Sequence, residues 1–345
     1  MRDIIGQRRL LAHLGEQALR GDVAHAYELS GPRSIGKRTV ATRVAQTLLC
    51  GSEPRLAGGC GRCLACRKVE NGTHPDVRVV TRLMDLERRD DLKFISIEQV
   101  REMQQDLALR PLEGAWRVVI IDDAAELSEH AEVALLKTLE EPPPHAVLLL
   151  ITPTPSALLE TIRSRLQPLP FRLVATAEIA EALAARGGAG AAKYAAAAAG
   201  RPGIAITLAS DETARTARRV LENEFYKLVG SRLTDRFAWA VDLAESERDP
   251  QKRSALLKSR LVDWSDLLRD AATHAHGVDR PLRPDRKAES ATLADALGRR
   301  ELVDLALAFD RWRRDVVESN VNARMLLELL ALRVPYAQAF AGRSA

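Results

Sequence analysis

Cysteine is scarce in this sequence: the 345 residues contain four, and all of them lie between Cys50 and Cys66. Because there is none elsewhere, a disulfide framework spread over the chain is excluded, and the cluster indicates a metal site in a reducing compartment. The first ten residues, MRDIIGQRRL, lack the apolar core of a signal peptide. No uninterrupted apolar run is long enough to cross a bilayer. We therefore expect a cytoplasmic protein with no membrane partner.

A large excess of charge is also absent. Lysine and arginine number 51 against 47 acidic residues, which gives a formal net charge of +4. An excess this small argues against strong nucleic-acid binding by the chain alone, and the mixed signs along the sequence are typical of solvated helix faces. The length of 345 residues predicts two or three domains with a substantial buried core.

The stretch 118–144 organises the rest of the chain. It begins with four apolar β-branched residues, Val118 to Ile121, which predict a strand buried on both faces of a parallel sheet. Asp122 and Asp123 follow at the carboxyl end of that strand, where open α/β sheets bind their ligands. Ser128 is a candidate N-cap for the next helix, and Pro142 begins a run of three prolines that ends it.

A second apolar run, Val147 to Ile151, predicts another buried strand, which ends at the polar Thr152. This order of strand, acid, helix and strand is typical of a nucleotide site, and Thr152 is one of its candidate residues. Upstream, His25 to Ser30 predicts a short strand, and the glycine-rich segment GPRSIGKRT, residues 31–39, follows it and opens a helix. This is the context in which a phosphate-binding loop occurs.

The loop has the parts that bind phosphate but not the part that binds magnesium. Gly31 and Gly36 let backbone amides curl around an anion, and Lys37 supplies a positive charge at a helix N-terminus. The residue after the lysine should be Ser or Thr, whose hydroxyl ligates Mg²⁺. Here that residue is Arg38, and Thr39 is one residue late, turned by about 100° around the helix.

The acidic pair is altered in a similar way. Asp122 is the expected metal-associated carboxylate, but Asp123 stands where motor ATPases usually carry the longer Glu that orients water. Binding of ATP with Mg²⁺ and the loss of that binding both fit these residues, whereas efficient hydrolysis does not.

The four cysteines follow the phosphate loop with the spacing C-x9-C-x2-C-x2-C, formed by Cys50, Cys60, Cys63 and Cys66. Four thiolates separated by tight turns suit a tetrahedral zinc ion, and four protein ligands leave no open position for catalysis. A redox C-x-x-C pair would explain neither the overlapping second pair nor Cys50. His74, beside a proline, is a weaker candidate that we expect to be structural. The sequence therefore predicts a structural zinc site.

Beyond residue 172 the sequence predicts helices only. Residues 173–209 are rich in alanine and are divided by glycines into three short helices. From Asp211 onward the pattern is one of long helices that carry no motif of chemistry. We expect an α/β domain over 1–171 that contains the cysteine module, a small helical lid over 172–210 and an all-helical domain over 211–345.

Three features together resemble one family, the bacterial clamp-loader AAA+ ATPases of DNA polymerase III. They are ALLKTLEEPP, from Ala134 to Pro143, the four cysteines directly after the phosphate-loop helix, and the later pair Ser164–Arg165. The segment Asn320 to Leu330 extends the similarity weakly to the closing helix of the family's collar domain. The resemblance implies an α/β RecA-like P-loop (AAA+) domain, a small helical lid and a C-terminal all-α collar.

Within the family, the altered phosphate loop is similar to the delta-prime branch rather than to the gamma/tau motors, which carry GK-[ST], a DE pair and a lid arginine. Here Gly203 stands at the lid position and Arg201 lies two residues earlier. The resemblance implies a stator in a five-membered ring with gamma/tau and delta. Its Ser164–Arg165 pair would supply a trans arginine finger to the ATP held by a neighbouring motor, and the ring would load the sliding clamp on primed DNA.

Two other functions fit the residues. One is an ATP-hydrolysing motor of the gamma/tau type, which ATP turnover by the purified chain would favour. The other is a zinc-stapled nucleic-acid-binding protein without ring partners, which a salt-sensitive affinity for DNA would favour.

Overall fold

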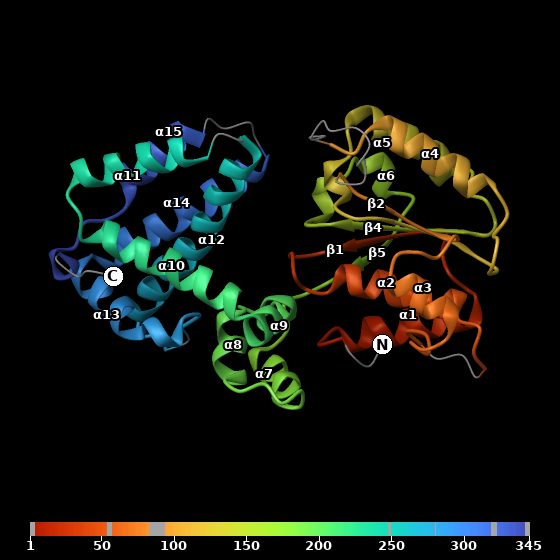
Figure 1. Ribbon diagram of the computed structural model, residues 1–345, viewed down its shortest axis with the longest axis horizontal. Coiled ribbons are helices and arrows are strands. Elements are labelled where there is room, and N and C mark those ends of the chain that lie inside the picture. The colour runs from red at the N-terminus through yellow and green to blue at the C-terminus, as the bar shows by residue number, and fades with distance from the viewer. Residues whose placement is uncertain are drawn as a thin grey trace. The chain divides into compact units, whose positions relative to one another are not determined.

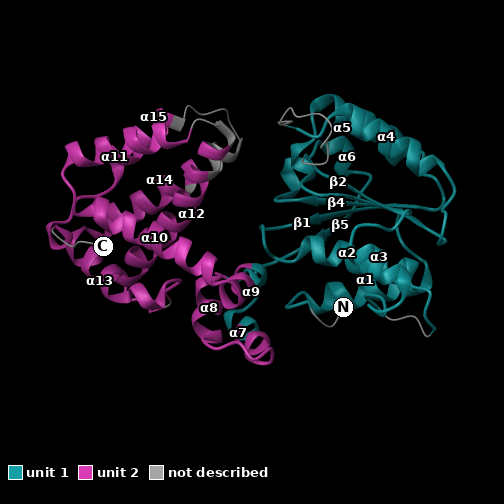
Figure 2. Cartoon of the chain, in the orientation of Figure 1, with its two compact units in different colours: residues 1–179, 200–203 teal, residues 180–199, 204–345 magenta. Residues whose placement is uncertain are grey.

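The chain forms two compact units in a computed structural model (Figures 1 and 2), residues 1–179 with 200–203 and residues 180–199 with 204–345. The structure describes residues 4–53, 57–82, 94–247, 250–279, 281–318 and 323–341. The sequence predicts a surface loop over the charged segment 81–93; residues 83–93 of it, and residues 320–322 of the segment from Asn320 to Leu330, lie outside the described residues. The predicted boundaries of three domains, at 171/172 and 210/211, stay a prediction.

Unit 1 is built on a five-stranded, all-parallel sheet with the order β2-β3-β4-β1-β5. The strands are β1 Ala26–Ser30, β2 Val77–Val80, β3 Arg117–Ile121, β4 Ala146–Thr152 and β5 Gln167–Pro170. Every residue of β1, β3 and β4 is buried, as the apolar runs in β3 and β4 predict; β1 is buried although it contains Glu28 and Ser30. This architecture confirms the predicted RecA-like P-loop fold.

Helices cover both faces of the sheet, with α1, α2 and α3 on one face and α4, α5 and α6 on the other (Figure 1). They are α1 Arg8–Arg20, α2 Lys37–Leu49, α3 Leu64–Glu70, α4 Ile97–Ala108, α5 Glu129–Glu140 and α6 Glu160–Arg163, with 3-10 turns at Ala124–Glu126 and Pro155–Ala157. The predicted cap of α5 is confirmed, since the Ser128 hydroxyl accepts the backbone N–H of Ala131 at 3.3 Å. The two helical layers exclude water from the apolar strands and leave the strand ends to form a site.

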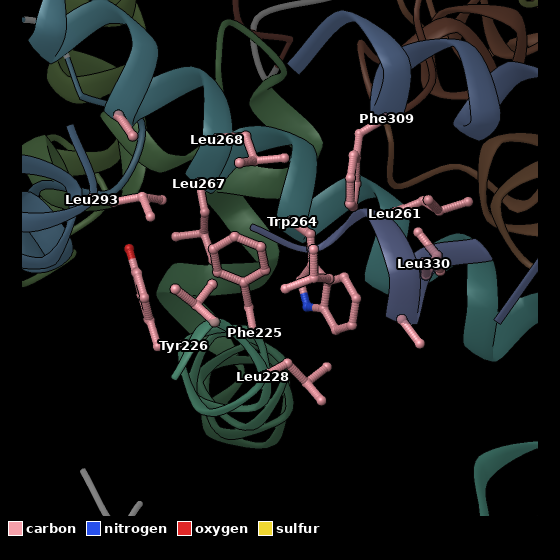
Figure 3. Close-up of a cluster of buried hydrophobic side chains, with 14 of the residues drawn as sticks. Phe225, Tyr226, Leu228, Leu261, Trp264, Leu267, Leu268, Leu293, Phe309 and Leu330 are labelled. Carbon is pink, nitrogen blue, oxygen red and sulfur yellow. The ribbon is translucent and has the colours of Figure 1, made fainter. Parts of the chain in front are cut away.

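The rest of the chain is helical. Its helices are α7 Thr176–Ala184, α8 Ala191–Ala197, α9 Pro202–Ser210, α10 Glu212–Val229, α11 Leu233–Ser246, α12 Pro250–Ala275, α13 Lys287–Ala296, α14 Arg299–Glu318 and α15 Ala323–Arg333, with 3-10 turns at Pro284–Arg286 and Gln338–Phe340. Figure 3 shows the core of unit 2, in which the rings of Phe225 and Trp264 lie 5.6 Å apart. Within the described residues, every helix is too short or too polar to cross a membrane.

A buried arginine joins three helices of unit 2. Arg236, on α11, is only 4% exposed. Its guanidinium donates to the carbonyls of Leu228 (2.9 Å) and Val229 (3.3 Å) at the end of α10, and to those of Val334 and Pro335 (3.0 Å) just after α15. A cation on carbonyls at the ends of two helices adds hydrogen bonds to these acceptors and interacts favourably with the negative ends of both helix dipoles. Arg236 is therefore a structural centre of this unit.

Candidate functional site

The sheet order places the predicted phosphate loop beside the ends of two other strands. Strand β1 lies next to β4, and the backbone N–H of Gly31 donates to the carbonyl of Thr152 at 3.2 Å. Strand β3 lies on the other side of β4, so Asp122 and Asp123 emerge at the same edge of the sheet. Residues far apart in sequence thus meet where α/β sheets bind ligands.

Lys37 folds back onto its own loop. Its ammonium donates to the carbonyl oxygens of Gly31 and Pro32, the latter at 2.8 Å, and the residue is 6% exposed. The turn into α2 depends on Gly36, whose φ of 101° favours glycine. Burial lowers the pKa of Lys37 to about 8, and the nearby carboxylate of Asp123 opposes that shift. The lysine has the position of a phosphate ligand, but loop carbonyls engage its charge.

Two arginines of the loop pair with the two aspartates. The Arg38 guanidinium donates to Asp122 at 2.5 Å, and the Arg33 guanidinium donates to Asp123, whose own φ of 64° lies in the left-handed region. Thr39, the displaced hydroxyl, is exposed on α2. Both carboxylates are therefore neutralised by cations of the same chain. Sequence reasoning identified Arg38 as a defect but missed Arg33, because only the fold brings it to Asp123.

The lid-position glycine lies directly on the loop. The backbone N–H of Gly203 donates to the carbonyl of Ser34 at 2.9 Å, and a Cβ atom at Gly203 would lie only 2.8 Å from that oxygen. Real Cβ atoms do not approach this closely, so no side chain fits at this position without movement of the backbone. The segment 200–203 covers the loop through main-chain contact.

The Thr152 hydroxyl points to a buried acid. It donates at 3.2 Å to Glu28 of β1, and both residues are almost completely buried. Burial raises the pKa of Glu28, while the hydrogen bond from Thr152 and the charge of Arg163 oppose the rise. Sequence reasoning did not select Glu28, because the short strand predicted over His25 to Ser30 gave no sign that this acid is buried.

The Ser164–Arg165 pair lies at the surface, directly after α6. The Ser164 hydroxyl donates to the carbonyl of Thr161 at 3.0 Å. Arg165 donates to that same carbonyl at 2.7 Å and forms an ion pair with Glu140 at 2.8 Å. Among the described residues, no hydrogen bond joins Arg165 to the phosphate loop. The structure therefore does not bring the predicted finger to this chain's own loop.

The four cysteines lie together in unit 1. Their sulfur atoms are all within 4.8 Å of one another, and none is in a disulfide: Cys50, Cys60, Cys63 and Cys66. Around tetrahedral zinc, with Zn–S of about 2.3 Å, thiolate sulfurs lie about 3.8 Å apart. The Cys50–Cys63 separation of 3.9 Å matches this spacing. The donor set and its geometry fit zinc.

Hydrogen bonds to the sulfurs of Cys60 and Cys63 support the ionised form of these two thiols, whereas burial raises the pKa of Cys66 to about 12. The backbone N–H of Cys63 donates to Cys60 at 3.3 Å, and that of Cys66 donates to Cys63 at 3.4 Å. The Ser52 hydroxyl also donates to Cys60, and these donors lower the pKa of Cys60 to about 5. His74 lies outside the cluster. Its Nδ1 accepts the backbone N–H of Asp76, so this histidine stabilises a turn, as the sequence predicts.

Comparison with known proteins shows that the α/β part of the chain is similar to subunits of DNA polymerase III. Residues 6–175 match the family model described as DNA polymerase III, delta subunit. The delta' subunit of DNA polymerase III from Pseudomonas aeruginosa is 41% identical over 181 residues, which are 51% of this chain and 52% of that one. The tau subunit from Escherichia coli is 37% identical over 163 residues, 47% of this chain and 24% of that one.

Among the solved structures that match over most of their length is a DNA polymerase III gamma subunit-related protein from Thermotoga maritima. It is 14% identical with a TM-score of 0.43, and the match covers 94% of this chain and 98% of that one. The chain spans about half the length of the Pseudomonas relative and about a quarter of the length of the Escherichia relative.

Proposed function

We propose that the protein is a clamp-loader subunit of the delta-prime type, because residues 6–175 match the family model described as DNA polymerase III, delta subunit. In this proposal it joins gamma/tau and delta subunits in a five-membered ring. The ring opens the sliding clamp and places it on primed DNA, and this chain serves as a stator that hydrolyses no ATP itself.

The closed phosphate loop is the observation that carries this proposal. Lys37 is held by loop carbonyls, and Asp122 and Asp123 are paired with arginines of the same chain. A subunit that hydrolyses ATP needs its loop lysine to contact the phosphates and a carboxylate to bind the magnesium ion. These contacts favour the stator over the gamma/tau-like motor, which the similarity to tau keeps as the second candidate.

The chain's contribution to catalysis in the ring is then Arg165. It lies on the surface, away from the chain's own loop contacts, with its side chain 35% exposed. An arginine supplied in trans stabilises charge that develops on the transferred phosphoryl group, an effect of about 10³–10⁵ in rate in other systems. Arg165 would supply that charge to ATP on the neighbouring subunit, with Ser164 at the base of its turn.

Assembly with partner subunits tests the proposal. Purified chain is mixed with gamma/tau and delta subunits of the same organism, and clamp loading on primed DNA is measured with and without it. We expect a stable complex in size-exclusion chromatography, and loading that depends on this chain. Failure to form a complex would contradict the proposal.

The purified chain alone should turn over little or no ATP. Arg38 occupies the position of the magnesium-binding hydroxyl and pairs with Asp122, while Lys37 is engaged by the loop. A steady-state phosphate-release assay checks this. Turnover at the rate of a motor ATPase that Lys37→Ala abolishes would establish the motor function instead.

We also propose that the cysteine cluster holds one structural zinc ion. Cys50 at the end of α2, and Cys63 and Cys66 in the first turn of α3, join the two helices through it together with Cys60. The metal would fix the connection 51–63 against α2 and supply no chemistry, because its four positions are filled by thiolates.

Freshly purified, reduced protein should contain one zinc ion per chain by elemental analysis. Cys63→Ser should lower the zinc content and increase proteolysis between residues 51 and 70, because a ligand and the N-cap of α3 are both changed. Unit 1 should stay folded, since the cluster lies outside the sheet. A chain purified without stoichiometric zinc would refute the assignment.

A further inference from the structure

Acceptors of the same chain hold the guanidinium of Arg165 through its two terminal nitrogens, Nη1 and Nη2. Nη1 donates to the carbonyl of Thr161 at 2.7 Å and to the hydroxyl of Ser164 at 3.3 Å. Nη2 donates to the carboxylate of Glu140 at 2.8 Å. Among the described residues Nε has no acceptor. The two terminal nitrogens of the guanidinium, Nη1 and Nη2, are therefore held by hydrogen bonds, whereas the N–H of Nε can still donate to another group.

Helix α5 supplies the contacts that hold this turn in place. Helix α6, which leads into Arg165, has four residues and no side-chain cap, so it is too short to be stable alone. It packs against α5 and buries Ile162. Glu140, the last residue of α5, pairs with Arg165 just after the end of α6. Packing on α5 and an acid at the end of that helix thus hold the turn.

The ion pair is suited to orientation rather than to folding stability. The side chains of Arg165 and Glu140 are 35% and 52% exposed, and such exposed pairs contribute little to the free energy of unfolding. A long arginine side chain has many rotamers, and a charged hydrogen bond to a carboxylate selects among them. The pair leaves the guanidinium partly accessible, with its Nε–H free for an anionic oxygen.

We propose that Glu140 is a positioning residue for Arg165, an inference that rests on the proposed function. Its carboxylate supports the guanidinium from the α5 side, and the donors on the Nε side meet a phosphate oxygen of ATP on the neighbouring subunit. A catalytic group that loses such support becomes misplaced, and a displacement of about 1 Å can cost about 10²-fold in rate.

The test uses the assembled complex with clamp and primed DNA, and measures kcat and KM for ATP. Glu140→Ala should lower kcat by about tenfold and leave KM for ATP within about twofold, because the finger acts on the transition state. Glu140→Gln keeps an oxygen that can accept from Nη2, so it should retain most of the activity. The matched control is Glu141→Ala, which removes the adjacent exposed acid and should leave both constants unchanged.

A double-mutant cycle separates positioning from general structural support. If Glu140 acts through Arg165, the variant with Glu140→Ala and Arg165→Ala should be no slower than Arg165→Ala alone. Independent, multiplying losses would overturn the inference, and so would a silent Glu140→Ala or one that raises kcat. If Arg165→Ala itself leaves hydrolysis unchanged, the finger function fails first, which distinguishes the two failures.

Discussion

Replacing Arg165 with alanine should lower clamp-stimulated ATP hydrolysis in the assembled complex by at least about tenfold, because charge on the transferred phosphoryl group loses its guanidinium. Folding and ring assembly should be unaffected, since the side chain contacts only Thr161, Ser164 and Glu140 near the surface. Affinity for ATP should change much less than the rate. Single-turnover hydrolysis and a nucleotide-binding titration on the same complex separate these quantities.

Arg163 is the matched control, two residues away in the same turn and also exposed. Its charge acts on the buried Glu28, so Arg163→Lys is a cleaner substitution than Arg163→Ala. It should leave hydrolysis within about twofold, as most surface substitutions are close to neutral. Equal and mild effects of Arg165→Ala and the control would show that Arg165 is an ordinary solvated side chain.

Replacing Arg236 with methionine should destabilise unit 2 by about 3–5 kcal/mol, because carbonyls at the ends of α10 and α15 lose a buried charged donor. Methionine fills part of the volume but donates no hydrogen bond. Urea unfolding followed by tryptophan fluorescence measures the change. Three of the four tryptophans, Trp239, Trp264 and Trp312, lie in this unit, so the signal reports mainly on it.

Arg232→Ala provides the comparison, because this arginine is exposed at the start of α11 and makes no capping hydrogen bond. We expect a change within about 0.5 kcal/mol. A loss below about 1 kcal/mol for Arg236→Met would show that water or backbone movement satisfies the carbonyls in its place.

Strands β3 and β4 could be predicted from the sequence because buried parallel strands are continuously apolar. Strand β5 could not. Pro168 and Pro170 indicate the end of a domain, yet they lie in a strand that pairs with β1 alone. The backbone N–H of Phe171 donates to Ser30 of β1, and alternation along the strand directs positions 168 and 170 away from β1. An edge strand tolerates proline there, which sequence alone does not reveal.

The residues of the candidate site could be predicted from the sequence, but the contacts between their side chains could not. The glycines, Lys37 and the two aspartates follow from local patterns of strand, loop and helix. The pairing of Arg38 with Asp122 joins residues 84 positions apart, and the contact of Thr152 with Glu28 joins residues 124 apart. Such contacts depend on strand order, which single-sequence patterns do not determine.

The main-chain contact between Gly203 and Ser34 has an evolutionary consequence. Arg38→Thr alone would return a hydroxyl to the loop but leave Asp122 without its cation, and any side chain at Gly203 would clash with the Ser34 carbonyl. Each of these single steps toward an ATP-binding loop therefore removes a contact or adds a clash before it provides a new contact. Selection acting one substitution at a time would for this reason favour keeping the altered loop as it is.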